Sequence, residues 1–262
     1  MTNLQAIYHI PPSKWMRSLP LVGTCVAVSV IGLATPAKAT TPSFSAQPAS
    51  SIIAEARTAM SNADAVSASG NGPVNVPGVG KVTVSEQDYS GATSGTQSLR
   101  MTAPQPRSGT ISASVSVVDG QLYVDANAAF WSSTAGLSEA EAANAANRWV
   151  QIQSSSPLYG PVAADLTMPS LITDLFSSSN FHKGHVRTID GVRSIAITYM
   201  NSGNDAGKAT CYVELGGKHL PVSVTLGGLS FRLEGWGKTK AVTAPTGAVQ
   251  LSNIIPPSVS TA

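Results

Sequence analysis

Charge and cysteine are both scarce in this sequence. Only 11% of the 262 residues are Asp, Glu, Lys or Arg, and the chain holds two cysteines. The formal net charge is +2, and it becomes about −1 when Lys14, Arg17 and Lys38 of the N-terminal segment are left out. No basic patch then remains that favours nucleic acid or a polybasic contact with a membrane. Because the β-branched content is too high for disorder, we expect a folded, Ser/Thr-rich exported protein.

Signatures of catalysis and of metal binding are also lacking. No serine lies in the G-x-S-x-G turn of a hydrolase, and the nearest string, Gly91–Gly95, has the wrong spacing. His182 and His185 have no third ligand near in sequence, whereas zinc sites need a larger ligand set. Residues 75–82 lack the first Gly and the Ser/Thr of a phosphate-binding loop. We therefore expect no enzyme activity, no metal and no cofactor.

Residues 1–39 have the pattern of a secretory signal peptide. A basic head precedes an apolar run over Leu19–Ala34, and the small-x-small string Ala37–Ala39 follows. We expect cleavage after Ala39 and a location in the cell envelope or outside the cell. An uncleaved membrane anchor is one alternative, and lipid attachment at Cys25 is another. Thr24, directly before this cysteine, fits lipidation poorly, so we expect membrane contact to be transient unless Cys25 carries a lipid.

The longest regular pattern covers residues 209–251. Between its glycine pairs, apolar residues alternate with others, which is typical of strands buried on one face. The pairs at 216–217 and 227–228 predict hairpin turns. We expect three antiparallel strands with these inward residues: Cys211, Val213 and Leu215; Leu220, Val222, Val224 and Leu226; Leu229, Phe231 and Leu233.

Shorter alternating runs predict further strands before this meander. Asp119–Gly120 and Asp190–Gly191 are expected turns between neighbouring strands. Residues 71–80, rich in Gly and Pro, are expected to form a loop, and residues 40–50 a flexible lead. The predicted strands are 65–70, 81–86, 98–102, 109–118, 121–125, 186–189 and 192–199.

Three helices are expected alongside these strands. Ser51 is the predicted N-cap of the first, and Ser138 with Glu141 forms a capping box for the second. The third should cover Pro169–Phe176, because proline suits the first turn of a helix. Their apolar sides are expected to be Ile53, Ala56, Met60 and Ala63; Ala142, Ala146 and Trp149; and Leu171, Ile172, Leu175 and Phe176.

These elements predict an α+β fold with one domain over residues 51–252 and a disordered tail over 253–262. The strands follow one another through hairpins, so we expect a single antiparallel sheet with helices on one face. That face is either a dry core or the wall of a space for an acyl chain. Each buried CH₂ contributes ~0.8 kcal/mol, so a sixteen-carbon chain offers on the order of 12 kcal/mol before ordering costs. In both interpretations Cys211 is a buried, unreactive thiol.

The order of several motifs resembles a known family. Asp119–Val124 reads D-G-x-L-Y-V, Trp131 follows it, and an Ala-rich segment ends in Arg148–Val150. Tyr212–Val222 reads Y-V-E-L-G-G-K-H-L-P-V, and Leu233–Lys238 reads L-E-G-W-G-K. Over about residues 50–252 this order is similar to the LppX/LprG-type exported proteins of actinobacteria, whose fold is like that of the lipoprotein carrier LolA.

The resemblance implies a half-barrel sheet closed by helices around an apolar cavity. It also implies non-enzymatic binding and transfer of lipid or glycolipid within the cell envelope. The alternative is an envelope regulatory or interaction module of the same fold, which acts through contacts with a protein partner. The inward strand residues that we expect to line a lipid cavity are Val115, Val117, Leu122, Val124, Ile195, Ile197, Val213, Leu215, Val222, Val224, Phe231 and Leu233.

Overall fold

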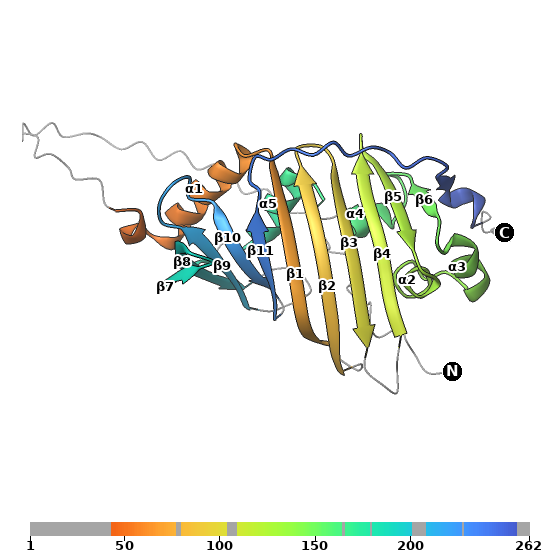
Figure 1. The fold of residues 1–262 in the computed structure, drawn as a ribbon, viewed down its shortest axis with the longest axis horizontal. Helices are drawn as coiled ribbons and strands as arrows, with labels where there is room; N and C mark the ends of the chain where they lie inside the picture. The colour runs from red at the N-terminus through yellow and green to blue at the C-terminus, as the bar shows by residue number, and fades with distance from the viewer. Residues whose placement is uncertain are drawn as a thin grey trace, which may run out of the picture.

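A single sheet of twelve strands organises the described part of the chain (Figure 1). The computed structural model describes residues 43–76, 80–103, 109–163, 166–178, 180–200, 208–226 and 228–255, so the expected signal peptide and Cys25 lie outside it. The strands are β1 (Ala65–Val76), β2 (Gly80–Gly91), β3 (Gly95–Ala103), β4 (Gly109–Val118), β5 (Gln121–Ala126), β6 (Trp149–Ile152), β7 (His182–Ile189), β8 (Val192–Met200), β9 (Lys208–Glu214), β10 (Pro221–Leu226), β11 (Leu229–Glu234) and β12 (Val249–Gln250).

The sheet consists of two antiparallel meanders that meet side by side. Its order is β12-β6-β5-β4-β3-β2-β1-β11-β10-β9-β8-β7. Strands β1–β6 form one meander and β7–β11 form the other, and antiparallel pairing of β1 with β11 joins them. The short strand β12 pairs in parallel with β6. The predicted single sheet is therefore confirmed.

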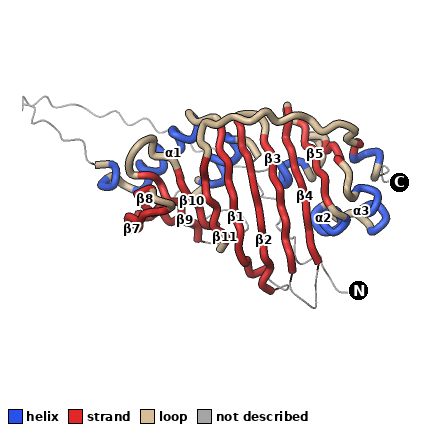
Figure 2. The backbone as a smooth tube through the Cα atoms, in the orientation of Figure 1, coloured by secondary structure: helices blue, strands red, loops and turns tan. Residues whose placement is uncertain are grey.

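The helices are α1 (Ala49–Ser61), α2 (Ala128–Thr134), α3 (Glu139–Ala145), α4 (Tyr159–Ala163) and α5 (Met168–Leu175). Their apolar residues pack against the same face of the sheet. Figure 1 shows α4 and α5 behind the sheet, while the C-terminal segment crosses in front of it. Figure 2 shows that this segment is a loop along most of its path. Two short 3₁₀ helices, η2 (Phe44–Ala46) and η3 (Leu251–Asn253), flank the domain. The predicted α+β class is confirmed.

The Asp-Gly turns are where the sequence predicts them. Asp119 and Gly120 have φ of 50° and 74°, and Asp190 and Gly191 have φ of 49° and 83°. Positive φ at both central residues is the conformation of a two-residue hairpin turn that matches the twist of the strands. The hairpins β4–β5 and β7–β8 follow from these two dipeptides.

The expected loop over residues 71–80 is wrong over 71–76 and at Gly80, while residues 77–79 lie outside the described ranges. Strand β1 continues to Val76 and pairs with β2 along its whole length, including Pro73 opposite Thr83. On its other side β1 pairs with β11 only as far as Gly70. Pro73 therefore lies where β1 has one hydrogen-bonded neighbour, which is the edge-like setting in which a sheet tolerates proline.

Two helix boundaries also differ from the prediction. Helix α1 begins at Ala49 with Pro48 as N-cap, two residues before the predicted cap Ser51. Helix α3 has the predicted capping box but ends at Ala145, because Asn147 has φ of 55° and its N–H bonds to the Ala126 carbonyl. Trp149 therefore belongs to strand β6 and not to the helix.

Helices α2 and α4 were not predicted, whereas α5 was. The Asn127 side chain caps α2 by accepting a hydrogen bond from the Phe130 N–H at 3.0 Å. This helix has only seven residues, two of them aromatic, so its apolar residues do not repeat often enough to show helical spacing in the sequence. Helix α5 covers the predicted range within one residue, with its proline in the first turn.

Candidate functional site

The face of the sheet under the helices, which we call the inner face, carries two separate apolar clusters. One cluster joins α1 and α5 to strands β1 and β8–β11. The other joins α2 and α3 to strands β4–β6. Strands β2 and β3 lie between them in the sheet. Any opening on the inner face is therefore expected along these two strands.

Ten of the twelve residues predicted to line a cavity belong to one of these two clusters or pack against it. Nine of the twelve are at most 6% exposed and pack in the core: Val115, Val117, Leu122, Val124, Ile195, Ile197, Val213, Val224 and Leu233. The other three, Leu215, Val222 and Phe231, are half-buried. The helices thus cover most of the predicted wall, and the surface that a ligand can reach lies elsewhere on the same face.

A β-bulge changes the orientation expected for Val222. The register between β9 and β10 shifts between Pro221 and Ser223, and Pro221 stands opposite Val213. Residues paired across an antiparallel ladder share a face, so Pro221 takes the inward place that alternation assigns to Val222. Val224 returns to the inner face, opposite Cys211.

The partly open part of the inner face is a strip along β2, β3 and β11, which we call the central strip. It consists of Glu86, Asp88, Gln97, Leu99, Met101 and Phe231, all of them half-buried. Leu99, Met101 and Phe231 pack on a small third cluster formed by Val82, Val84 and Leu229. The strip therefore joins apolar and carboxyl side chains between the two helix-covered clusters.

Two carboxyl groups share this strip. The Gln97 amide donates a hydrogen bond of 2.7 Å to Glu86 Oε1, and Asp88 Oδ1 is buried without a hydrogen-bond partner in the described residues. Burial and, as a smaller cause, the negative charge of Glu86 together raise the pKa of Asp88 to about 8. Burial also raises the pKa of Glu86. At neutral pH Asp88 is protonated and can donate to Glu86, which removes one charge from an apolar surface.

The sequence of β2 carries a signal for the position of these two carboxyls. One face of this strand changes from apolar to acidic along the chain, because every second residue lies on it: Val82, Val84, Glu86 and Asp88. The predicted strand stopped at Glu86, whereas β2 continues to Gly91. A longer strand would have placed both carboxyls on the inner face.

The inner face also contains the expected buried thiol. Cys211 is 0% exposed, and burial raises its pKa to about 12. Tyr199 lies nearby on strand β8 with its hydroxyl buried and without a partner in the described residues. Burial raises the pKa of this hydroxyl as well. These two side chains pack in the core and offer no reactive group to a ligand.

Three solved structures resemble the chain weakly. A DUF1329 family protein from Desulfovibrio piger is 10% identical with a TM-score of 0.30, over 74% of this chain and 95% of its own. A putative outer membrane lipoprotein-sorting protein domain from Vibrio parahaemolyticus is 12% identical with a TM-score of 0.27, over 69% and 87%. A LolA superfamily protein from Nitrosomonas europaea is 12% identical with a TM-score of 0.26, over 72% and 91%. No family model and no curated protein matches the chain.

The geometry defines an α+β protein with one open sheet and a helix-covered apolar face. Within the described ranges, no helix is both long and apolar enough to cross a bilayer. The inner face offers hydrocarbon-like surface next to two half-buried carboxyls, Glu86 and Asp88, whose pKa values are raised by burial.

Proposed function

We propose that this protein is a non-enzymatic exported carrier that holds the acyl chains of a lipid or glycolipid on its inner face and moves them within the cell envelope. The observation that carries the proposal is the central strip. Large apolar side chains are half-exposed there, on the face where the helices cover the rest of the sheet. Burying such surface against an acyl chain is favourable by ~0.8 kcal/mol for each CH₂.

The expected path of an acyl chain follows the central strip. Leu99, Met101 and Phe231 offer contiguous apolar surface next to Val84 and Leu229. A hydrocarbon chain needs volume and apolar walls, with few polar contacts. Movement of α5 away from the sheet would extend this surface toward the residues predicted from the sequence, among them Val224 and Leu233. The resemblance to LppX/LprG-type proteins and the N-terminal export pattern support the same proposal.

Lipid that co-purifies with the protein tests this proposal. The full-length protein is purified from its own host, extracted with organic solvent and analysed by mass spectrometry. We expect acyl lipids in stoichiometric amount. If none is recovered, and none transfers from fluorescently labelled dioleoylphosphatidylglycerol vesicles, the carrier proposal fails.

A pair of neighbouring substitutions shows which face is used. Leu99→Arg places a charge on the central strip, and Ser98→Arg places it on the opposite face of the same strand. Lipid should be lost from Leu99→Arg and retained by Ser98→Arg. Circular dichroism and thermal melting establish that both variants are folded. Equal lipid content in folded Leu99→Arg and wild-type protein would contradict the proposed location.

One observation favours an envelope interaction module as the second candidate function. Strand β7 lies at the end of the sheet, and its residues from His182 to Thr188 are exposed, including Val186 at 41%. An end strand can pair with a strand of a partner protein through its backbone. Cross-linking in the envelope from a photoreactive residue at Val186 tests this candidate. A single protein partner, together with protein that carries no lipid, would favour it over the carrier.

A further inference from the structure

The C-terminal segment over residues 237–250, which we call the strap, crosses the sheet on the face opposite the helices (Figure 1). We call this face the outer face. At one end the Gly237 N–H bonds to the Ala65 carbonyl at 2.9 Å, and the Lys240 N–H bonds to the Tyr89 hydroxyl at 2.7 Å. At the other end Val249 pairs with Val150 of β6. Among the described residues, no hydrogen bond joins 241–248 to the sheet. The strap is therefore held at its two ends.

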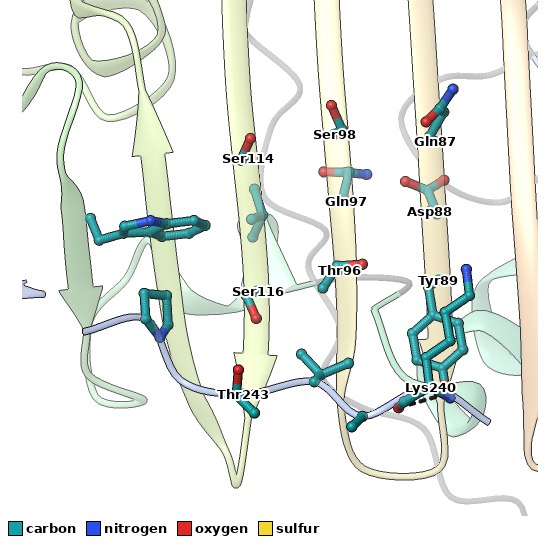
Figure 3. A pocket seen from close by; sticks show the side chains of 15 residues that line it. Gln87, Asp88, Tyr89, Thr96, Gln97, Ser98, Ser114, Ser116, Lys240 and Thr243 are labelled. Carbon is teal, nitrogen blue, oxygen red and sulfur yellow. Dashed lines mark hydrogen bonds between the residues drawn. The ribbon is translucent and has the colours of Figure 1, made fainter.

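A groove of about 510 Å³ lies between this strap and the outer face. Figure 3 shows its floor, where side chains of three neighbouring strands stand in rows beside the strap. One row runs from Gln87 through Ser98 to Ser114, which are paired across β2, β3 and β4 and exposed. The same row continues through Asp125 to Trp149. At about 4.8 Å for each strand, it spans about 19 Å.

The second row lies beneath the strap and contains an unpaired polar atom. Tyr89, Thr96 and Ser116 are paired across the same three strands. Ser116 is 4% exposed, and its Oγ has no hydrogen-bond partner in the described residues. Figure 3 shows this oxygen directed toward the strap at Thr243. A buried hydroxyl without a partner is costly, so this atom marks a position where a ligand group would gain a hydrogen bond.

The groove offers almost no free charge. Among the lining side chains, Asp88 is the one carboxyl, Lys240 the one amine and Tyr89 a phenol, and the exposed row adds the carboxyl of Asp125 between Ser114 and Trp149. Strand alternation places Asp88 on the inner face. The Lys240 ammonium lies 5.2 Å from the centre of the Tyr89 ring and 3.3 Å from Ser67 Oγ. Phosphate or carboxylate ligands would find no cluster of cations here, so a neutral ligand fits best.

The lining matches the chemistry of sugar hydroxyls. Serine, threonine and glutamine side chains both donate and accept hydrogen bonds, as sugar hydroxyls do. Trp149, half-buried at the end of the exposed row, supplies a flat apolar ring with an N–H donor at its edge. A peptide strand would fit less well, because the backbone groups of these inner strands are already paired on both sides.

We propose that this outer groove binds a neutral oligosaccharide in extended form, laid across strands β2–β6 along the strap. The ligand hydroxyls bond to the exposed row, one of them reaches Ser116 Oγ, and a sugar ring packs on Trp149. The inference does not depend on the carrier proposal, because the two sites occupy opposite faces of the sheet.

Titration calorimetry with the full-length protein tests the inference. The probes are maltohexaose, cellohexaose, chitohexaose and mannohexaose, each offered to millimolar concentration. We expect at least one to bind, and Ser114→Val and Trp149→Ala to weaken it about tenfold, since each removes a hydrogen bond or the ring contact. Ser112→Val is the matched control, because Ser112 lies on the same face of β4 outside the groove and should leave affinity within about twofold.

Two outcomes would overturn the inference. One is that none of the four probes binds. The other is undiminished binding to Ser98→Arg, a substitution at an exposed position that should leave the fold unchanged. Lipid content measured on the same samples separates the two proposals. Ser98→Arg should lose oligosaccharide and keep lipid, whereas Leu99→Arg should lose lipid and keep oligosaccharide.

Discussion

Gly70 and Phe231 face each other across the seam that joins the two meanders. They are paired between β1 and β11, and a Cβ placed on Gly70 would lie 2.8 Å from two carbons of the Phe231 ring. The ring thus occupies the space that a side chain on β1 would take. Glycine at this position allows an aromatic ring to pack over the backbone where the first meander meets the second.

Gly70→Ala should therefore destabilise the protein. The added methyl group displaces the Phe231 ring, and overpacking of this kind costs about 1–3 kcal/mol. Denaturant unfolding measures the change in the free energy of unfolding. Gly72→Ala is the matched control, because the nearest atom to its Cβ is Leu229 Cδ1 at the ordinary contact distance of 3.5 Å. Equal stability of the two variants would show that the ring moves aside at no cost.

The seam also illustrates what the sequence could predict. The local signals held: the Asp119–Gly120 turn, the capping box of Ser138 and Glu141, and the alternation through Cys211 and Val213 all appear in the structure. Each of them depends on a few neighbouring residues. The pairing of Gly70 with Phe231 joins residues far apart in the chain, and a local pattern contains no information on such a register.

The wrong predictions came from local sequence patterns that pairing with distant strands overrides. Glycine and proline in residues 71–76 favour a loop, but the pairing of Pro73 with Thr83 holds them in a strand. The bulge at Val222 interrupts a period-two pattern that has no break in sequence. The outer groove could not be predicted, because it needs the strap to return over strands that lie more than a hundred residues earlier.

Asp88→Asn should change how stability depends on pH. The pKa of Asp88 is raised from 3.8 when unfolded to about 8 when folded, so the native state binds the extra proton between these values. The contribution of Asp88 to the free energy of unfolding is complete below pH of about 4, and it decreases as the pH rises to about 8. An asparagine mimics the protonated acid and removes this loss.

Thermal melting across pH measures the effect. The variant should match the wild type below pH of about 4 and exceed it increasingly from there up to pH of about 8, with no further gain above. Asp125→Asn, on the outer face of β5, controls for the loss of one carboxyl from the sheet. Parallel melting curves for Asp88→Asn and the wild type would contradict a buried, protonated Asp88.

Cys211 should resist thiol reagents until the protein unfolds. Its side chain is fully buried, and its raised pKa keeps it in the thiol form at pH of about 8, whereas the thiolate is the reactive form. Labelling with a water-soluble maleimide should therefore follow the unfolding transition in urea. A surface cysteine introduced at Ser154, which is exposed, is the control and should react at every urea concentration. Rapid labelling of native Cys211 would reveal an opening of the α1–α5 cluster.

The Tyr89 hydroxyl should hold the strap to the sheet. It accepts a hydrogen bond from the Lys240 N–H at 2.7 Å and donates one to the Lys240 carbonyl at 3.3 Å, while the ring itself is 4% exposed. Tyr89→Phe keeps the ring and removes both bonds. We expect a loss of about 1–2 kcal/mol and faster hydrogen exchange at the Lys240 amide, measured by NMR.

Tyr123→Phe is the matched control for this change. Tyr123 lies in the same row of the outer face and is 9% exposed, and in the described residues no hydrogen bond involves its hydroxyl. Loss of the Tyr123 hydroxyl should leave the rate of hydrogen exchange at the Lys240 amide unaltered. If Tyr89→Phe behaves in the same way as Tyr123→Phe, the strap is held by packing and by its pairing at β12, and the two bonds to Lys240 contribute little.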